Sequence, residues 1–218
     1  SALANAATAN PAVGADKFQR IIKEAYDANI LFLIQQAELR SNELNKGELK
    51  DWKDRVKQAN DAANQNVSVE VSAYASPDGG LSLNESLAER REANTTRYLK
   101  GELNKRKIDV PVGAHYTAQD WEGFKELVSK SNLQDKDLVL RVLSMYSDPE
   151  QREREIKNIS TVFRSLADEI LPKLRRSRLT ANIEIIGKSD EEISRLAQSN
   201  PKALNVEELL YAATLTTN

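Results

Sequence analysis

The sequence predicts an α+β fold: a two-layer sandwich with a mixed four-stranded sheet, helices packed on one face, and a helical insertion before the last strand. Two segments, residues 67–73 and 179–185, alternate apolar with polar side chains, as half-buried strands do. Apolar residues recur at helical spacing in residues 47–64 and 82–105. A longer helical block, residues 120–176, separates the third strand from the fourth.

Composition narrows the class of protein. The 218 residues suffice for one large domain or for one domain with an insertion. The 31 basic and 33 acidic side chains are intermixed and give a net charge of -2, so no nucleic-acid partner is expected. Cysteine is absent, which excludes disulfides and thiolate metal sites. The longest apolar run, residues 30–34, is too short to span a bilayer, so we expect no transmembrane segment.

The first third of the chain opens with a segment of low complexity. Residues 1–15 are rich in Ala and Asn and are expected to be a flexible linker. The beginning Ser-Ala-Leu-Ala-Asn, without Met, suggests a mature or excised fragment. Residues 17–24 fit either a strand or a helix, and residues 29–36 are expected to form a buried first strand.

The next elements follow from periodicity and capping. The helix in residues 47–64 has a repeating apolar face, made of Leu49, Trp52, Val56 and Ala59. After the second strand, Ser82 and Glu85 fit a capping box that opens a helix reaching about Lys105. A third strand is expected from about Val110 to Ala118.

The insertion, residues 119–178, is expected to hold three helices. Their apolar positions lie in residues 121–128, 138–146 and 156–174, and Asp148-Pro149 separates the second helix from the third. The fourth strand, residues 179–187, follows. Residues 188–218 are expected to form two C-terminal helices, the first opened by Ser189 and three acidic residues and the second capped by Asn205.

One charged side chain interrupts an apolar stripe. A step of about 100° per residue places Arg91 between Leu87 and Ala88, on the face that the helix from residue 82 should bury. A buried cation is costly unless a partner or an anionic ligand meets it. Arg91 therefore either binds a ligand or snorkels or pairs with a buried carboxylate. The Pro-Asp-Gly-Gly loop just before the helix favours a ligand.

The loop and helix resemble the peptidoglycan-binding domain of the OmpA family. Its motif residues are matched, without a gap between the first and the arginine, by Gly79, Asn84, Leu87 and Arg91, and its helix end by Tyr98-Leu99. The resemblance covers residues 29–118 and resumes at 179–187. It implies one domain built from residues 16–118 and 179–187, in the order β-α-β-α-β-β. The Ala-Ser-Pro-Asp-Gly loop is similar to a branch found in Bacteroidetes cell-envelope proteins, often attached to tetratricopeptide repeats.

The resemblance also implies a ligand. In the family, the arginine and a loop aspartate grip diaminopimelate, a zwitterionic residue of the peptidoglycan stem peptide. Arg91 would take the carboxylate, since guanidinium holds a carboxylate with two parallel hydrogen bonds. The aspartate position is Ser76 here, so the amino end would fall to Ser76 or, if the loop folds differently, to Asp78. Asn84 would brace the loop that contains Gly79.

Other residues offer weaker candidates. His115, the single histidine, lies on an expected strand and has no cysteine partners for a metal site, so no metal or cofactor is expected. Glu85 and Glu89 share one helix face, and with Asp78 they offer only an unenclosed carboxylate group for glycoside cleavage. Cations at a helix C-terminus are favourable, which explains most of a basic cluster expected there: Lys173, Arg175, Arg176 and Arg178.

Two functions remain as expectations. The first is a non-catalytic periplasmic module that anchors an outer-membrane-associated assembly to peptidoglycan, with envelope proteins as further partners. The second is a scaffold with a degenerate pocket, which binds proteins through the helical insertion. A hydrolase is a third and less favoured class, because no catalytic motif is present. Fold likeness alone does not decide among the three, because one fold serves many functions.

Overall fold

The computed structural model describes residues 19–216, so the linker expected in residues 1–15 lies outside the described part. The chain first forms β1 (Gln19–Leu31), α3 (Ser41–Leu44), α4 (Gly47–Asp61), β2 (Gln65–Tyr74), α5 (Leu81–Lys105) and β3 (Val112–Thr117). It continues with α6 (Trp121–Lys130), α7 (Lys136–Met145), α8 (Pro149–Asn158), α9 (Ser160–Glu169) and α10 (Leu171–Leu174). It ends with β4 (Arg176–Ser189), α11 (Asp190–Ser199), the 3-10 helix η1 (Pro201–Ala203) and α12 (Val206–Leu215).

The strands of the described chain form one mixed, four-stranded open sheet in the order β1-β4-β2-β3. Strands β2 and β3 are parallel, with Val69 opposite Val112 and Tyr74 opposite Thr117. Parallel neighbouring strands need a crossover connection, and α5 supplies it. The α+β class and the mixed four-stranded sheet predicted from the sequence are thus confirmed.

The chain divides into two compact units. The main unit contains Ala25–Ala62 and Val67–Asn182, and therefore α3 to α10 and most of the sheet. Of the described residues, the terminal unit contains 19–24, Ala63–Asn66 and 183–216.

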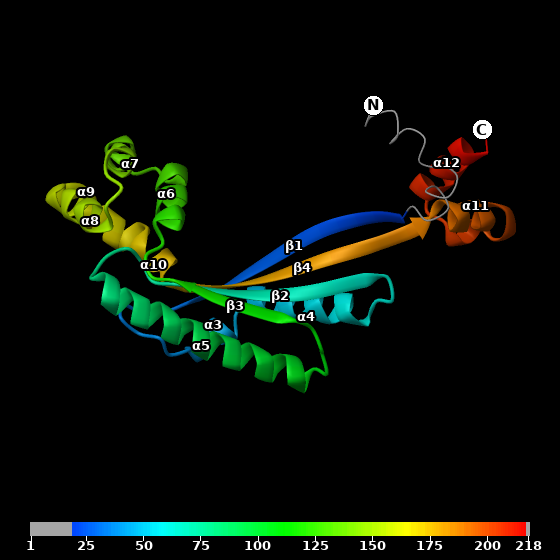
Figure 1. Ribbon diagram of the computed structural model, residues 1–218, viewed down its shortest axis with the longest axis horizontal. Coiled ribbons are helices and arrows are strands. Elements are labelled where there is room, and N and C mark those ends of the chain that lie inside the picture. Colours follow the sequence, from blue (N-terminus) through cyan, green and yellow to red (C-terminus); the bar gives the residue numbers. More distant parts are fainter. Residues whose placement is uncertain (1–18, 217–218) are drawn as a thin grey trace, which may run out of the picture. The chain divides into compact units, whose positions relative to one another are not determined.

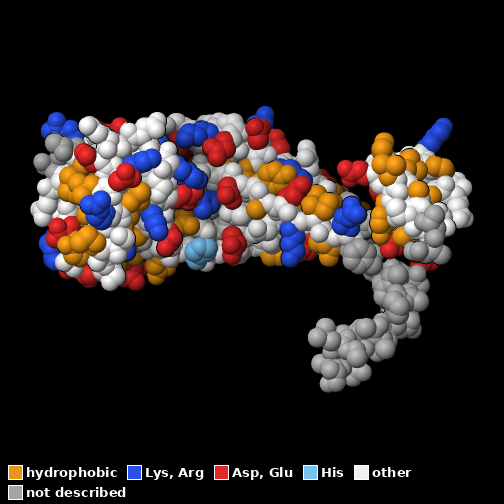
Figure 2. All heavy atoms as spheres, turned by 90° about the horizontal axis from the view of Figure 1, so that it is seen from above, with side chains coloured by type: hydrophobic (Ala, Val, Ile, Leu, Met, Phe, Trp, Pro, Cys, Tyr) orange, Lys and Arg blue, Asp and Glu red, His pale blue; other side chains and the backbone are white. Residues whose placement is uncertain are grey.

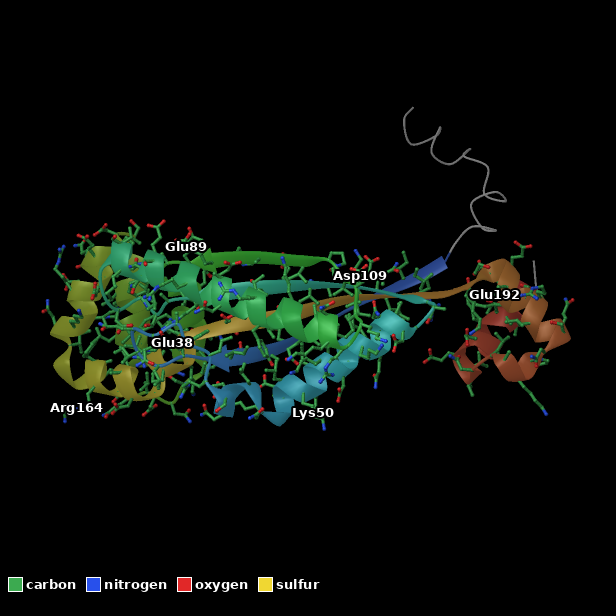
Figure 3. All side chains as sticks on the ribbon, turned by 90° about the horizontal axis from the view of Figure 1, so that it is seen from below. Glu38, Lys50, Glu89, Asp109, Arg164 and Glu192 are labelled. Atoms are coloured by element: carbon green, nitrogen blue, oxygen red, sulfur yellow. The ribbon has the colours of Figure 1, made fainter. Side chains whose placement is uncertain are left out.

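In the main unit, α4 and α5 lie side by side across one face of the strands (Figures 1 and 3). The expected apolar faces meet there in one core, the sheet core. Its buried residues are Ala28, Ile30, Phe32, Leu49, Trp52, Val56, Val69, Val71, Leu99, Leu103, Ile108, Leu179 and Ala181. Lys53 of α4 bridges to α5, where its Nζ donates to Tyr98 Oη at 3.0 Å and to Glu102 at 3.4 Å.

Strand β1 differs from the strand expected at residues 29–36. It begins at Gln19 and ends at Leu31. Residues 19–24, for which the sequence allowed a strand or a helix, are therefore part of a strand. Leu33 and Ile34 are 44% and 57% exposed, and Gln35 has a φ of 55°. The apolar run at residues 30–34 therefore begins in β1 and ends in a turn, which apolar composition alone does not indicate.

Helix α5 begins one residue earlier than expected and without the predicted capping box. Its N-cap is Gly80, which makes no side-chain capping bond, and the Gly80 carbonyl accepts the N–H of Asn84 at 3.0 Å. Ser82 and Glu85 lie inside the helix and are exposed. The prediction was wrong because Gly80 is already in the extended conformation that an N-cap residue adopts.

Helices α6 to α10 form a helical lobe with its own core, the lobe core. Phe124, Val128, Val139, Leu143, Leu166 and Leu174 are among its buried residues. The single helix expected at residues 156–174 is three helices, because α8 ends at Asn158 and Pro172 stands in the first turn of α10. The Asp148-Pro149 break is as predicted, and the Asp148 side chain accepts the Gln151 N–H at 2.9 Å. The expected insertion also extends too far, since β4 starts at Arg176.

In the terminal unit, α11 and α12 pack together through a small core of Ile193, Leu204 and Ala212. Both predicted caps are present. Ser189 Oγ accepts the Glu192 N–H at 3.1 Å, and Asn205 and Glu208 form a reciprocal capping box.

Candidate functional site

The loop between β2 and α5, residues 75–80, is held at its root by the main chain. The Ala75 N–H donates to the Thr117 carbonyl at 3.2 Å, and the Ala75 carbonyl accepts the Asp120 N–H at 3.2 Å. Beneath the loop, Ala75 packs with other small and apolar residues in a buried cluster completed by Ala37, Leu87 and Ala88. The loop therefore starts from a fixed point beside β3.

Asn84 braces the loop from inside, as expected. It is buried, and its Nδ2 donates to the carbonyls of Ser76 and Asp78 at 3.2 Å each and of Gly79 at 3.4 Å. Gly79 has a φ of +103°, a left-handed conformation that a residue with a Cβ adopts only with strain. The amide of one helix residue thus fixes the path of three loop residues.

This path turns the Asp78 side chain back toward Ser76. The Ser76 hydroxyl is within hydrogen-bonding distance of Asp78 Oδ1 and donates to it. Ser76 is buried, whereas Asp78 is half-buried. The acidic group of the loop therefore comes from Asp78, and Ser76 orients it.

Arg91 has no exposed surface, and its guanidinium is bound to main-chain carbonyls. Nε donates to Gln36 at 2.9 Å, Nη1 to Tyr74 at 2.9 Å and Nη2 to Leu33 at 3.2 Å. The guanidinium also lies 5.0 Å from the centre of the Phe32 ring. Neither snorkelling nor pairing with a buried carboxylate describes this side chain, because three carbonyls accept its hydrogen bonds.

Arg91 nevertheless forms part of a pocket wall. The pocket has a volume of about 210 Å³ and contains all five residues expected at the site, together with others from the lobe. Its lining is Ile34, Gln35, Ser76, Asp78, Gly79, Leu83, Asn84, Leu87, Arg91, Lys157, Phe163 and Arg175. Burial and the positive charge of Arg175 lower the pKa of Arg91 to about 10, and the negative charge of Asp78 acts in the opposite direction.

The helical lobe supplies three lining residues that sequence reasoning did not place here: Lys157, Phe163 and Arg175. In the sequence, Arg175 is recognised only as one residue of a basic cluster expected at a helix end. Instead, it lies between α10 and β4, and its partners in that cluster, Arg176 and Arg178, lie on β4 with their guanidinium groups over the Tyr74 ring. Nothing local in the sequence indicates that the lobe folds back onto the loop.

A direct hydrogen bond joins the lobe to the loop. The Gly79 N–H donates to Glu153 Oε1 of α8 at 2.9 Å, and the same carboxylate pairs with Lys157 at 2.6 Å. The resemblance accounts for the loop and α5 but not for this contact, since the insertion is extra to the compact domain. The lobe therefore forms part of the pocket.

His115, Glu85 and Glu89 do not line this pocket. His115 is exposed on β3, and Glu85 and Glu89 are exposed on α5, which Figure 3 shows for Glu89. No group of three or more His, Cys, Asp or Glu side chains that could hold a metal ion occurs in residues 19–216. On the face shown in Figure 2, basic and acidic side chains are intermixed.

A second groove lies between Tyr74, β4 and α6. Asp120 caps α6 by accepting the Gly123 N–H at 2.9 Å and pairs with Arg176 at 3.5 Å. Burial raises the pKa of Asp120, while the same burial lowers the pKa of Arg176. This ion pair joins the lobe to the sheet, and the two charges balance each other.

Among the described helices, none has the length and apolar character needed to cross a membrane. Comparison of the chain with models of known protein families and with curated proteins gives no match.

Proposed function

We propose that this chain is a non-catalytic cell-envelope binding module that anchors an outer-membrane-associated assembly to peptidoglycan through the diaminopimelate of the stem peptide. The observation that carries the proposal is the presence of the Asp78 carboxylate and of two guanidinium groups, those of Arg91 and Arg175, in the wall of the same pocket. At the position of the family's loop aspartate this chain has Ser76, and in this proposal Asp78 takes the part of that aspartate. The proposal places the protein in the periplasm, with envelope proteins as further partners.

The chemistry of the wall suits a zwitterion. The Asp78 carboxylate accepts hydrogen bonds from an ammonium group, while the guanidinium groups in the pocket wall offer donors to a carboxylate. The pocket, at about 210 Å³, is small beside ordinary ligand sites and matches the end of one amino-acid side chain. Backbone N–H groups at the start of α5 add a favourable dipole for the carboxylate.

Topology supports the family resemblance. The sheet order β1-β4-β2-β3, the parallel pair β2–β3, and the position of α4 and α5 on one face are compatible with an OmpA-like β-α-β-α-β-β domain. We propose the same two-layer sandwich for the main unit, interrupted before β4 by the helical lobe.

Calorimetric titration with a diaminopimelate-containing stem peptide tests the proposal. Wild-type protein is expected to bind saturably, and Asp78→Asn to lose about 10- to 100-fold in affinity, because a hydrogen bond to a charged group contributes about 1.5–3 kcal/mol. Asp109→Asn makes the same change at an exposed residue beyond the end of α5 and should bind like wild type (Figure 3). Equal affinity in both variants would remove Asp78 from the site.

A scaffold without peptidoglycan binding is the second candidate. It is favoured by the three carbonyls that already occupy Arg91 and by the bond from Gly79 to Glu153, which ties the loop to the lobe. If folded wild-type protein binds no stem peptide, a photo-crosslinking residue at exposed Arg164 on α9 should capture an envelope protein. The same residue at exposed Lys50 on α4 is the control (Figure 3).

A further inference from the structure

We propose that Arg175 is the residue that binds the ligand carboxylate in this pocket, while Arg91 mainly holds the surrounding backbone in place. The inference rests on the proposed function and assigns a specificity-determining residue to its site. Three independent features of the main unit support it: the anchoring of the Arg175 backbone, the state of its side-chain nitrogen, and the charges around it.

The backbone of Arg175 is fixed to the sheet. Arg175 is the residue between the end of α10 and the start of β4, and its carbonyl accepts the Phe32 N–H at 2.7 Å. Phe32 directly follows β1 and belongs to the sheet core. A side chain that starts from such a fixed point can be placed accurately in a binding site.

The side-chain nitrogens of the two arginines in the pocket differ in their hydrogen bonds. Arg91 donates from Nε, Nη1 and Nη2 to three carbonyls. Arg175 Nε is buried and has no hydrogen-bond partner among the described residues. Three carbonyls already accept from Arg91, whereas no acceptor in the described part of the chain competes at Arg175 Nε, so a ligand acceptor gains more at the Arg175 guanidinium than at Arg91.

The charges around the pocket also favour an anion at Arg175. Arg91, Arg175 and Lys157 bring positive charge to the wall, and Lys157 is paired with Glu153. Asp78, the acidic lining residue, already accepts the Ser76 hydroxyl. A ligand carboxylate beside Arg175 would pair with its guanidinium and reduce the repulsion between Arg175 and Arg91.

This arrangement gives the helical lobe a function in binding. The last turn of the lobe, α10, leads directly into Arg175, and α8 and α9 contribute Lys157 and Phe163 to the same wall. Recognition of the carboxylate thus comes from the insertion, and recognition of the ammonium comes from the loop at Asp78.

The test compares two stem peptides that differ in one group. The first contains diaminopimelate, and the second contains lysine in its place, which keeps the ammonium but lacks the carboxylate. Arg175→Gln is expected to bind the diaminopimelate peptide about 30-fold more weakly than wild type, the loss of one charge-assisted contact. Its affinity for the lysine peptide should stay at the wild-type value.

Two further variants control for structure and charge. Arg164→Gln removes an exposed arginine on α9 and should leave both affinities unchanged. Arg175→Lys should recover only part of the lost affinity, because an ammonium lacks the planar fork of a guanidinium. The melting temperature of Arg175→Gln should be no lower than that of wild type, since removing Arg175 relieves its repulsion of Arg91.

The outcomes separate the two proposals. Failure of folded wild-type protein to bind the diaminopimelate peptide would overturn both. Wild-type affinity in Arg175→Gln would overturn the assignment of Arg175 and leave peptidoglycan binding standing. An equal loss of affinity for both peptides would also overturn it, because the effect would not concern the carboxylate.

Discussion

Arg91 is a buried cation whose neighbours are carbonyl dipoles. Its three bonds join segments far apart in sequence: the turn after β1, through Leu33 and Gln36, and the end of β2, through Tyr74. Without the Arg91 guanidinium, each of these three carbonyls would lose a hydrogen-bond donor. The side chain thus connects the turn to the site, whatever the pocket binds.

Replacing Arg91 should therefore destabilise the protein. We expect Arg91→Met to lower the free energy of unfolding by about 3–5 kcal/mol, as when one partner of a buried polar network is removed. Urea denaturation measures the change. Arg90→Met, at the exposed neighbouring position on α5, should change stability by less than about 0.5 kcal/mol. A loss below about 1 kcal/mol in Arg91→Met would show that the carbonyls find other donors.

The periodicity of α5 was enough to identify Arg91 as buried, but it could not identify its partners. Leu33 and Gln36 accept from Arg91 only because β1 ends at Leu31, and the apolar residues there had predicted a continuing strand. The sequence left the alternatives Ser76 and Asp78 open, and it did not indicate that the loop path would bring the two side chains into contact in one pocket wall. Arg175 could not be placed, because its position depends on how the lobe folds back.

At the scale of elements, the entry to α5 depends on two adjacent glycines with different conformations. Gly79 has a φ of +103°, and a Cβ there would lie 3.5 Å from Asn84 Oδ1. Gly80 has a φ of -69°, and a Cβ there would meet no atom within 4 Å. The first glycine is required by the backbone, whereas the second is not.

Alanine at the two positions should have effects of different size on stability. Gly79→Ala is expected to destabilise the protein by about 1–2 kcal/mol, because a Cβ strains the left-handed conformation. Gly80→Ala is expected to change stability by less than about 0.5 kcal/mol, because its restriction of the unfolded chain is offset by the poorer N-cap that Ala makes. Thermal unfolding of the two variants measures both. Destabilisation of equal size in both would contradict the assigned backbone conformations.

Elements with a local signal were predicted well. The alternation around Val69 and Val71 predicted β2, and Asn205 as an N-cap predicted the start of α12. The lobe was harder, since apolar residues continue at helical spacing from Ile156 to Leu174 although the backbone breaks at Ile159 and again before Pro172. Side-chain periodicity reports which face is buried but not whether the helix is continuous.

At the scale of the whole molecule, the main unit contains a sheet core and a lobe core that share no buried residue. Cooperative units of a protein often coincide with such separate cores and open with different free energies. The lobe therefore need not unfold together with the sheet. The α+β class and the four strands were predictable because each core has its own apolar pattern, whereas the contact between lobe and loop is non-local.

Truncating one core should weaken that core alone. Leu166→Ala is expected to lower the protection of amides in α7 and α9 by about 2–4 kcal/mol, the cost of a cavity in a packed interior. Protection of β2 should remain as in wild type. Native-state hydrogen exchange measures both regions. The matched variant Val71→Ala, in the sheet core, should weaken β2; parallel losses in both regions for either variant would mean that the cores open as one.

The two tryptophans of the sequence fall one to each core. Trp52 is buried under the sheet, where its indole Nε1 donates to the Tyr26 carbonyl at 2.9 Å. Trp121 opens α6 and packs edge-on against Phe124, with the Arg152 guanidinium 5.6 Å from the centre of its ring. The intrinsic fluorescence of this chain is therefore a sum of two emitters with different surroundings. Substituting either tryptophan by phenylalanine leaves an optical probe of the other core, without any added label.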